Sequence, residues 1–241
     1  MWVPDVYHGA PTSVAAFVGT APKIAAVVFA FRILVTGLGT VHHDWSQMFA
    51  VLAVASLLVG NLAAIMQANI KRMLAYSTIS HMGFILLAFM AGAVGFAAGL
   101  YYAITYALMA AVGFGVLMVL STDSIECEEI KDLAGLNQRH AWFAFLMLLA
   151  MFSMAGIPPL MGFYAKFGVI KALLSASTAQ NAAMASSTYI VLAVFAVVMS
   201  LIGAFYYLRV VKVMYFDEPT HDQPVGSNYA AKFFLSVNAF L

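Results

Sequence analysis

Charged residues are scarce in this sequence, and their scarcity excludes the water-soluble classes of protein. Only 9% of the 241 residues are charged and 64% are hydrophobic, whereas a soluble domain has about 25% charged residues. The mean hydropathy is +0.95. A soluble chain of this composition would lack the polar side chains that cover a surface in water. The composition therefore excludes a soluble enzyme and a disordered tail, and it indicates a polytopic helical membrane protein.

The sequence also has little excess positive charge and little cysteine, and these two features exclude further kinds of partner and site. The 11 Lys and Arg residues are balanced by 10 Asp and Glu residues, for a net charge of +1, so no basic patch can neutralise the phosphates of a nucleic acid. Cys127 is the single cysteine, which excludes a disulfide framework and a multi-cysteine metal site. His42 and His43 with Asp44 are interpreted as a surface loop, and metal binding is the weaker alternative. We therefore expect neither a nucleic-acid partner nor a bound metal.

The sequence also lacks the fingerprints of redox and nucleotide cofactors. It contains no G-x-G-x-x-G after a strand, no P-loop and no cysteine cluster for an iron–sulfur centre. We expect this chain to bind no cofactor, so any energy source for its activity must lie in a partner.

Six apolar segments are long enough to cross the hydrocarbon core of a bilayer, which takes about 20 residues as a helix. They cover residues 13–35, 46–66, 73–91, 95–120, 141–174 and 187–211, and a seventh begins at residue 229. Strands of a membrane barrel would be about 10 residues long with strict alternation, unlike these. We predict an all-α transmembrane bundle that forms a single membrane domain over 1–241. Since residues 229–241 are too few to span, we expect a fragment of a larger protein with a truncated last helix.

The fifth segment is too long for one straight helix and contains a helix-breaking motif. Its 34 residues would extend about 51 Å as an α-helix. In its middle, Pro158 and Pro159 lie between Gly156 and Gly162, and two adjacent prolines remove two backbone donors and clash with the preceding turn. We predict a broken helix. Unpaired backbone at membrane depth occurs only inside protein or beside a water-filled cavity, and such breaks mark ion or substrate paths in transporters.

Successive loops alternate sides of the membrane, and the basic residues of the loops and of the end of the sixth segment collect on one side. The loops at 36–45, 92–94 and 175–186 carry no Lys or Arg, and the other side holds Lys71, Arg72, Lys131, Arg139, Arg209 and Lys212. The positive-inside rule predicts that this side, with the N-terminal residues, is cytoplasmic.

Most of these charges have a simple structural interpretation. Basic side chains at helix ends, including Lys71, Arg72, Arg209 and Lys212, are expected to extend to the membrane interface. The acidic group is expected to form a solvated loop, with a docking site for a partner subunit as the alternative; it contains Glu126, Glu128, Glu129 and Asp132.

Three basic side chains are predicted to lie deep in the membrane on three different helices. Lys23 is about 15 Å into the first segment and His81 about 12 Å into the third. Lys166 follows Pro159 by seven residues in the second half of the broken helix. A charged lysine at the bilayer centre costs about 2.5–3.5 kcal/mol on insertion scales. Such a cost is rarely retained without a function.

The chemistry that these residues suggest is a proton relay. Burial disfavours the charged form of a lysine, and histidine titrates near neutral pH without perturbation. Hydroxyl groups and water would bridge the gaps; the candidates are Ser77, Thr78, Ser80, Tyr101, Tyr102, Thr105 and Tyr106. Alternatively, His81 only bonds a neighbouring helix. For Arg32 and Lys171 the sequence leaves both a relay role and extension to the interface open.

Three stretches of the sequence resemble the antiporter-like, proton-pumping subunits of respiratory complex I. Residues 1–12 read MWVPDVYHGAPT and 21–25 read APKIA; residues 69–83 read NIKRMLAYSTISHMG; residues 153–167 read SMAGIPPLMGFYAKF. The resemblance covers essentially the whole chain. The opening segment separates complex I from the Mrp cation/proton antiporters, which usually vary it.

The resemblance implies a fourteen-helix fold with two inverted five-helix repeats, of which this chain would hold helices eight to fourteen and the second repeat at roughly 46–212. It implies that Lys23 is the helix-eight lysine of a central hydrophilic axis. His81 would line the second half-channel, and Lys166 would face the proton exit. The glutamate of helix five and the lysine of helix seven have no counterpart here, so the chain would hold only part of a pathway.

The implied function is to couple electron transfer from NADH to quinone, performed in partner subunits, to proton movement across the bacterial inner membrane. NADH, FMN, iron–sulfur clusters and quinone would be bound by those partners, and neighbouring antiporter-like and small membrane subunits would contact this chain. An Mrp-type or hydrogenase-linked antiporter subunit is the nearest alternative. A structural membrane subunit that moves no protons is the alternative from another class.

Overall fold

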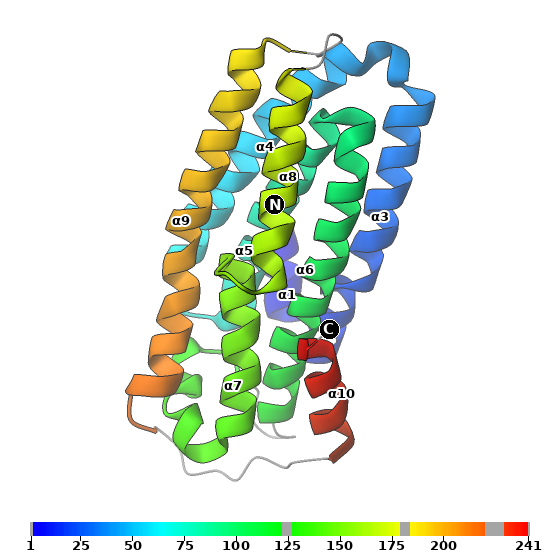
Figure 1. The fold of residues 1–241 in the computed structure, drawn as a ribbon. Helices are drawn as coiled ribbons and strands as arrows, with labels where there is room; N and C mark the ends of the chain where they lie inside the picture. Colours follow the sequence, from blue (N-terminus) through cyan, green and yellow to red (C-terminus); the bar gives the residue numbers. More distant parts are fainter. Residues whose placement is uncertain (1, 122–126, 179–183, 220–228, 241) are drawn as a thin grey trace.

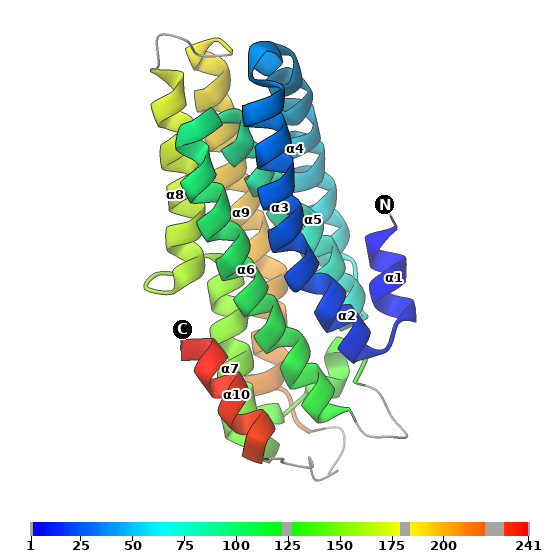
Figure 2. The ribbon, with the colours of Figure 1, turned by 90° about the vertical axis from the view of Figure 1, so that its right-hand side faces the viewer.

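The computed structural model describes residues 2–121, 127–178, 184–219 and 229–240. Within these ranges the chain is an all-α bundle whose long helices run side by side (Figures 1 and 2). The predicted fold class is therefore confirmed. Five stretches are long and apolar enough to span a membrane: Thr12–Gly37, Gly39–Ile65, Ile70–Met90, Gly92–Leu120 and Ser186–Phe216. They correspond to five of the six predicted segments.

The remaining predicted span is the fifth segment, residues 141–174, which was predicted to be a broken helix. The structure confirms the break. Helix α7 (Leu136–Ala155) ends at Gly156, which adopts a left-handed conformation with φ of +89° that suits glycine. Helix α8 (Met161–Ser177) starts after the two prolines. In Figure 1, α7 and α8 stand one above the other with the irregular segment between them. The hydroxyl of Ser153 in α7 accepts a hydrogen bond of 3.0 Å from the amide of Gly162 in α8, which joins the two halves.

A second break was not predicted. The sequence suggests one continuous helix over residues 13–35, but the structure divides it into α2 (Thr12–Gly19), α3 (Ala21–Phe31) and a π-helical turn over Arg32–Gly37. The break lies at Thr20, with φ of −121° and ψ of −86°. Pro22 has no N–H and is favourable only in the first turn of a helix. Lys23 therefore lies in the first turn of α3 and not in the middle of a long helix.

Helix α5 (Ile70–Met90) lies at the centre of the bundle. It is the most buried of the five candidate spans, since 78% of the residues in its most apolar stretch are buried. It contacts α1 (Val3–Gly9), α4 (His42–Ile65), α6 (Gly92–Leu120), α8 and α9 (Ser186–Phe216). Helix α10 (Tyr229–Phe240) lies along α6 and α7 (Figure 2). Polar side chains on α5 are therefore enclosed on several sides by other helices.

The basic residues at 71–72, 131–139 and 209–212 gather at one end of the bundle, as the alternation of loops predicts. The Arg209 guanidinium near the end of α9 donates to the carbonyls of Ile65 and Gln67 at 2.9 and 2.5 Å. The backbone at Asn69 pairs with Glu129 in an isolated bridge. These contacts bring the turn between α4 and α5 against the segment that precedes α7.

Candidate functional site

Helix α5 places four polar side chains in the interior of the bundle: Ser77, Thr78, Ser80 and His81 are all buried. A buried polar group that lacks a hydrogen bond costs several kcal/mol. Each of these four side chains makes one to a neighbouring helix. They form the polar centre of an otherwise apolar bundle.

Lys23 is held by hydroxyl groups from two other helices. Its amine donates to the Tyr7 hydroxyl at 2.8 Å and to Thr78 Oγ1 at 3.3 Å. The Thr78 hydroxyl also shares a hydrogen bond of 2.5 Å with the Tyr106 hydroxyl, and the amine lies 4.9 Å from the centre of the Tyr106 ring. Helices α1, α3, α5 and α6 therefore meet at this amine.

His81 bonds a tyrosine through each of its ring nitrogens. Nδ1 lies 2.7 Å from the Tyr102 hydroxyl and Nε2 lies 2.9 Å from the Tyr207 hydroxyl. Tyr207 shares a further hydrogen bond with Ser77. A neutral imidazole donates through one nitrogen and accepts through the other, so the two tyrosines take opposite roles. The His81 ring also lies 4.6 Å from the ring of Tyr106, which joins it to the surroundings of Lys23.

The polar centre extends from α5 toward α4 and α9. The amide of Asn61 donates to Ser80 Oγ at 2.9 Å, and the Tyr206 hydroxyl donates to Asn61 Oδ1 at 3.3 Å. The rings of Tyr206 and Tyr207 lie 4.3 Å apart. This branch connects back to the partner of His81.

Lys166 is bound at the end of a broken helix. Its amine donates to the carbonyl of Ala155 and to Ser200 Oγ, both at 2.8 Å. Ala155 is the last residue of α7, and the final carbonyls of a helix have no partner within it and attract positive charge. Lys166 also lines a cavity of about 420 Å³ between the break, α8 and α9. The helix break thus exposes the backbone carbonyl that binds the Lys166 amine.

The three predicted residues lie in one row across the bundle, although they do not touch directly. Tyr106 lies between Lys23 and His81. The ring of Phe84 stacks on Tyr102 at 5.5 Å and lies 5.6 Å from the Lys166 amine. We call Lys23, His81 and Lys166, with these intervening side chains, the central row.

Some members of the row's network were predicted and others were not. Tyr102, Tyr106, Ser77, Thr78 and Ser80 take part, whereas Tyr101 is 41% exposed and lies on another face of α6. Thr105 is buried and lines a separate cavity of about 280 Å³ beside α10. The sequence reasoning missed Tyr7, Asn61, Ser200, Tyr206 and Tyr207. Polar side chains within the second and sixth apolar segments were the available signal for all of these except Tyr7.

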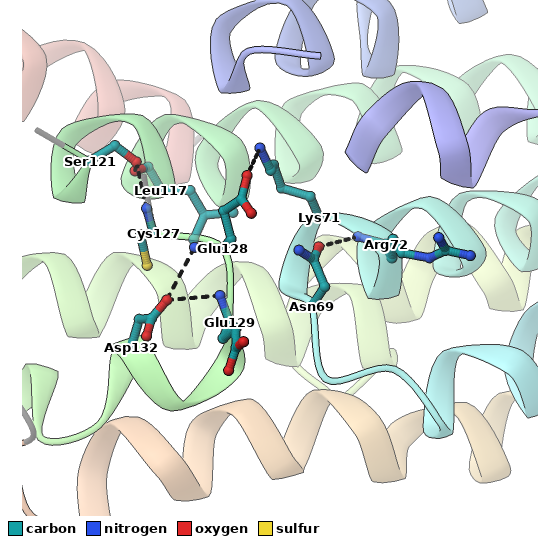
Figure 3. Close-up of polar contacts among 9 residues, drawn as sticks. All are labelled: Asn69, Lys71, Arg72, Leu117, Ser121, Cys127, Glu128, Glu129 and Asp132. Carbon is teal, nitrogen blue, oxygen red and sulfur yellow. Dashed lines mark hydrogen bonds and ion pairs between the residues drawn. The ribbon is translucent and has the colours of Figure 1, made fainter. Parts of the chain in front are cut away.

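The start of α5 corrects the prediction that Lys71 extends to the interface. The Lys71 side chain is 1% exposed, and its amine lies 2.8 Å from Glu128 Oε1 on a side chain that is 41% exposed. Figure 3 shows the two side chains pointing toward each other, Lys71 from α5 and Glu128 from the segment that precedes α7. The Ile70 amide also donates to the Glu128 carbonyl at 2.7 Å. The loop folds back over the helix end, and this buries the lysine.

Glu128 and Glu129 of the acidic group are 41% and 49% exposed, in line with the predicted solvated loop, and hydrogen bonds to Asp132 hold their backbone. The amides of Glu128 and Glu129 donate to Asp132 Oδ2 at 3.2 and 2.8 Å (Figure 3). Glu126 lies outside the described residues. Cys127 is buried beside this turn, and burial raises the pKa of its thiol to about 12, with the Asp132 carboxylate acting in the same direction. Glu129 pairs with Lys131 at 2.7 Å and raises the pKa of that lysine.

The parts of the chain that the structure describes contain no group of three or more His, Cys, Asp or Glu side chains that could hold a metal ion. His43 Nε2 instead lies 2.8 Å from the side-chain amide of Gln47. The polar centre is built from amines, an imidazole, hydroxyl groups and the Asn61 amide.

Comparison with known proteins finds relatives that are similar to this chain in sequence and in fold. The chain is 79% identical to NADH-quinone oxidoreductase subunit N of Neisseria gonorrhoeae, over 100% of this chain and 48% of that protein. Respiratory complex I from Thermus thermophilus matches with a TM-score of 0.81 and 30% identity, over 99% of this chain and 50% of that one. The Mrp complex from Dietzia matches with a TM-score of 0.77 and 25% identity, over 91% and 39%. The chain spans about half the length of the curated relatives that it matches.

The family comparison agrees with these relatives and confirms the resemblance seen in the sequence. The family described as NADH:quinone oxidoreductase/Mrp antiporter, TM, matches residues 1–193. That range contains Lys23, His81 and Lys166 and both helix breaks. The chain therefore belongs to the NADH:quinone oxidoreductase/Mrp antiporter transmembrane family.

Proposed function

We propose that this chain is a proton-translocating part of an NADH-quinone oxidoreductase in a bacterial inner membrane. The central row carries the proposal, because it sets two half-buried lysines and a buried histidine in a chain of contacts across the bundle. The identity of 79% to a subunit N supports this assignment over an Mrp-type antiporter.

The first part of the path is a chain of hydroxyl groups. The Thr78 hydroxyl donates to the carbonyl of Leu74 at 3.0 Å. When the Lys23 ammonium gives a proton to the Thr78 oxygen, Thr78 turns its own proton toward the Tyr106 oxygen, and Tyr106 releases its proton toward His81. The short contact between the Tyr106 and His81 rings leaves one water or a small rotation to complete the transfer, since a bridging water serves nearly as well as a direct hydrogen bond.

His81 is the centre of the path because both of its nitrogens are engaged. A proton accepted on one nitrogen makes both nitrogens donors, and loss of the other proton restores the neutral ring with its roles exchanged. Two positive charges in the row repel each other in a poorly screened interior. A proton that arrives at one site therefore favours release from the next.

The redox chemistry belongs to partner subunits in this proposal. NADH, FMN, iron–sulfur clusters and quinone would be bound there, and adjacent antiporter-like and small membrane subunits would complete the pathway. The end of the bundle that carries Lys71 and Arg72 would face the cytoplasm. The second inverted repeat at roughly 46–212 remains part of this proposal.

The test is proton translocation by the intact complex with Lys166→Ala. We expect the number of protons moved per NADH to fall, because the amine that receives the proton is lost, and we would measure it with a pH-sensitive dye in inverted vesicles. Lys171→Ala is the matched control, since Lys171 lies on the same helix with an exposed side chain. Native gels would establish that equal amounts of complex assemble. Unchanged pumping per NADH in Lys166→Ala would remove Lys166 from the path and favour a structural subunit.

A further inference from the structure

Phe84 interrupts the central row at one point. Its side chain is 2% exposed, and its ring is stacked on Tyr102 with centroids 5.5 Å apart and planes 15° apart. On its other side, the Lys166 amine lies 5.6 Å from the ring centre. Tyr102 is hydrogen-bonded to His81, so a single phenyl ring stands between the histidine and the second lysine.

A phenyl ring cannot pass a proton along a chain of hydrogen bonds. It has no O–H or N–H to give and no lone pair to receive, whereas every other link of the row has a hydroxyl, an amine or an imidazole. The face of the ring does attract a cation. The ring therefore stabilises an ammonium on Lys166 while it blocks the proton's movement from His81.

The surroundings of Phe84 give the ring a place to move. It forms part of the wall of the 420 Å³ cavity at the helix break, together with Lys166, Gly156 and Phe167. Gly156 also lies against the lysine stem, because a Cβ atom there would come within 2.9 Å of Lys166 Cδ. A rotation of the Phe84 side chain into this cavity would leave a gap that water can fill between Tyr102 and Lys166.

We propose that Phe84 is the valve of the path, a positioning residue that keeps the proton at His81 apart from Lys166 until its ring swings into the cavity. The inference rests on the proposed function. In the open state, the N–H bond of a His81 imidazolium breaks and a new N–H bond forms on the neutral amine of Lys166, by way of Tyr102 and water. No electrons change hands, and the charge moves with the proton.

The experiment measures passive proton leak through the assembled complex. Vesicles that contain the whole complex receive a potassium diffusion potential without NADH, and the inward proton flux is followed with a pH dye. We expect Phe84→Ala to raise this leak several-fold, because water replaces the ring, and to lower the protons moved per NADH. The rate of NADH oxidation with an ionophore present is measured in the same vesicles, so that a loss of coupling is told apart from a loss of electron transfer.

Phe89→Ala is the matched control. Phe89 lies on the same helix, is 6% exposed and packs against Phe31 and Phe49, away from the row. It tests the loss of a buried phenyl ring without the loss of the barrier. An equal leak in Phe84→Ala and Phe89→Ala would overturn the valve.

Two further variants keep the inference testable. Phe84→Leu retains an apolar side chain and should leak little, whereas Phe84→Tyr places a hydroxyl between Tyr102 and Lys166 and should leak even if Phe84→Ala fails to assemble. A Phe84→Tyr complex whose proton leak equals that of the wild type would count against the valve. Adding Lys166→Ala to Phe84→Ala should abolish the extra leak, because the path then lacks its acceptor.

The outcome separates this inference from the proposed function. Normal pumping in Lys166→Ala would defeat the proposed function, whatever Phe84 does. Loss of pumping in Lys166→Ala together with a normal leak in Phe84→Ala and Phe84→Tyr would retain the function and defeat the valve alone.

Discussion

The basic end of the bundle holds a buried lysine and its central row holds two half-buried ones, and the two regions surround the amines differently. Lys71 faces the carboxylate of Glu128 at 2.8 Å. In the part of the chain that the structure describes, Lys23 and Lys166 bond neutral oxygens, from Tyr7, Thr78, Ser200 and a backbone carbonyl. Among the described residues, no carboxylate lies within ion-pair distance of these two amines.

This difference separates a structural lysine from one that can exchange its proton. A carboxylate at close range favours the charged form of an amine, whereas neutral oxygens solvate it without adding an opposite charge. The pair at Lys71 therefore fixes a charge and ties a loop to α5. The row leaves its two amines free to hold a proton or to release it.

The largest effect should come from Lys23→Ala compared with Lys71→Ala. In Lys23→Ala, the complex should assemble and oxidise NADH but move far fewer protons per NADH. Lys71→Ala breaks an ion pair, which costs about 3–5 kcal/mol for fully buried pairs and less here because Glu128 is 41% exposed. It should reduce assembly or heat resistance, while the complex that does assemble pumps normally.

Both variants are compared by native gels, by thermal inactivation and by protons moved per NADH. Lys23→Ala should lower pumping and leave assembly unchanged, whereas Lys71→Ala should lower assembly or heat resistance and leave pumping unchanged. A Lys71→Ala complex that assembles fully but no longer pumps would erase the distinction between the two regions.

A smaller change should convert one kind of lysine into the other. Ser200→Asp would place a carboxylate where a hydroxyl now lies 2.8 Å from the Lys166 amine. The new charge should hold the ammonium in place and slow pumping. Asparagine has nearly the same shape as aspartate but no charge, so Ser200→Asn should pump faster than Ser200→Asp. Proton translocation per NADH in the two variants measures the effect of the charge alone. Equal pumping in both would show that the neutral surroundings of Lys166 are unimportant.

The all-α bundle could be predicted because hydropathy acts over whole segments. Five apolar stretches and the break at Pro158 and Pro159 appear as expected, since two prolines leave few options for a helix. The break at Thr20 was missed because a single proline, Pro22, fits the first turn of a new helix as well as it interrupts an old one.

Partners that are distant in the sequence could not be predicted. Tyr7 and Tyr207 lie on the first and ninth helices, and only packing around α5 brings them to Lys23 and His81. Lys71 was assigned to the interface for the same reason, because Glu128 reaches it from a loop beyond the next helix. Charge at a helix end gives no information about a counter-charge that the fold supplies.

The smallest effect concerns Cys127, which reports whether the loop beside Lys71 is closed. Since burial raises the pKa of this thiol to about 12, the reactive thiolate is about one part in a thousand at pH 9, where an ordinary exposed cysteine is more than half ionised. Alkylation by iodoacetamide, followed by mass spectrometry between pH 7 and 10, should be slow throughout and should rise tenfold for each pH unit without a plateau. Glu128→Ala removes the contact that holds the loop to α5 and should speed labelling, whereas Glu129→Ala removes only the pair with Lys131 and should not. Labelling of the wild-type protein that levels off near pH 9 would mean that the loop stands open, and the ion pair at Lys71 would then no longer contrast with the amines of the central row.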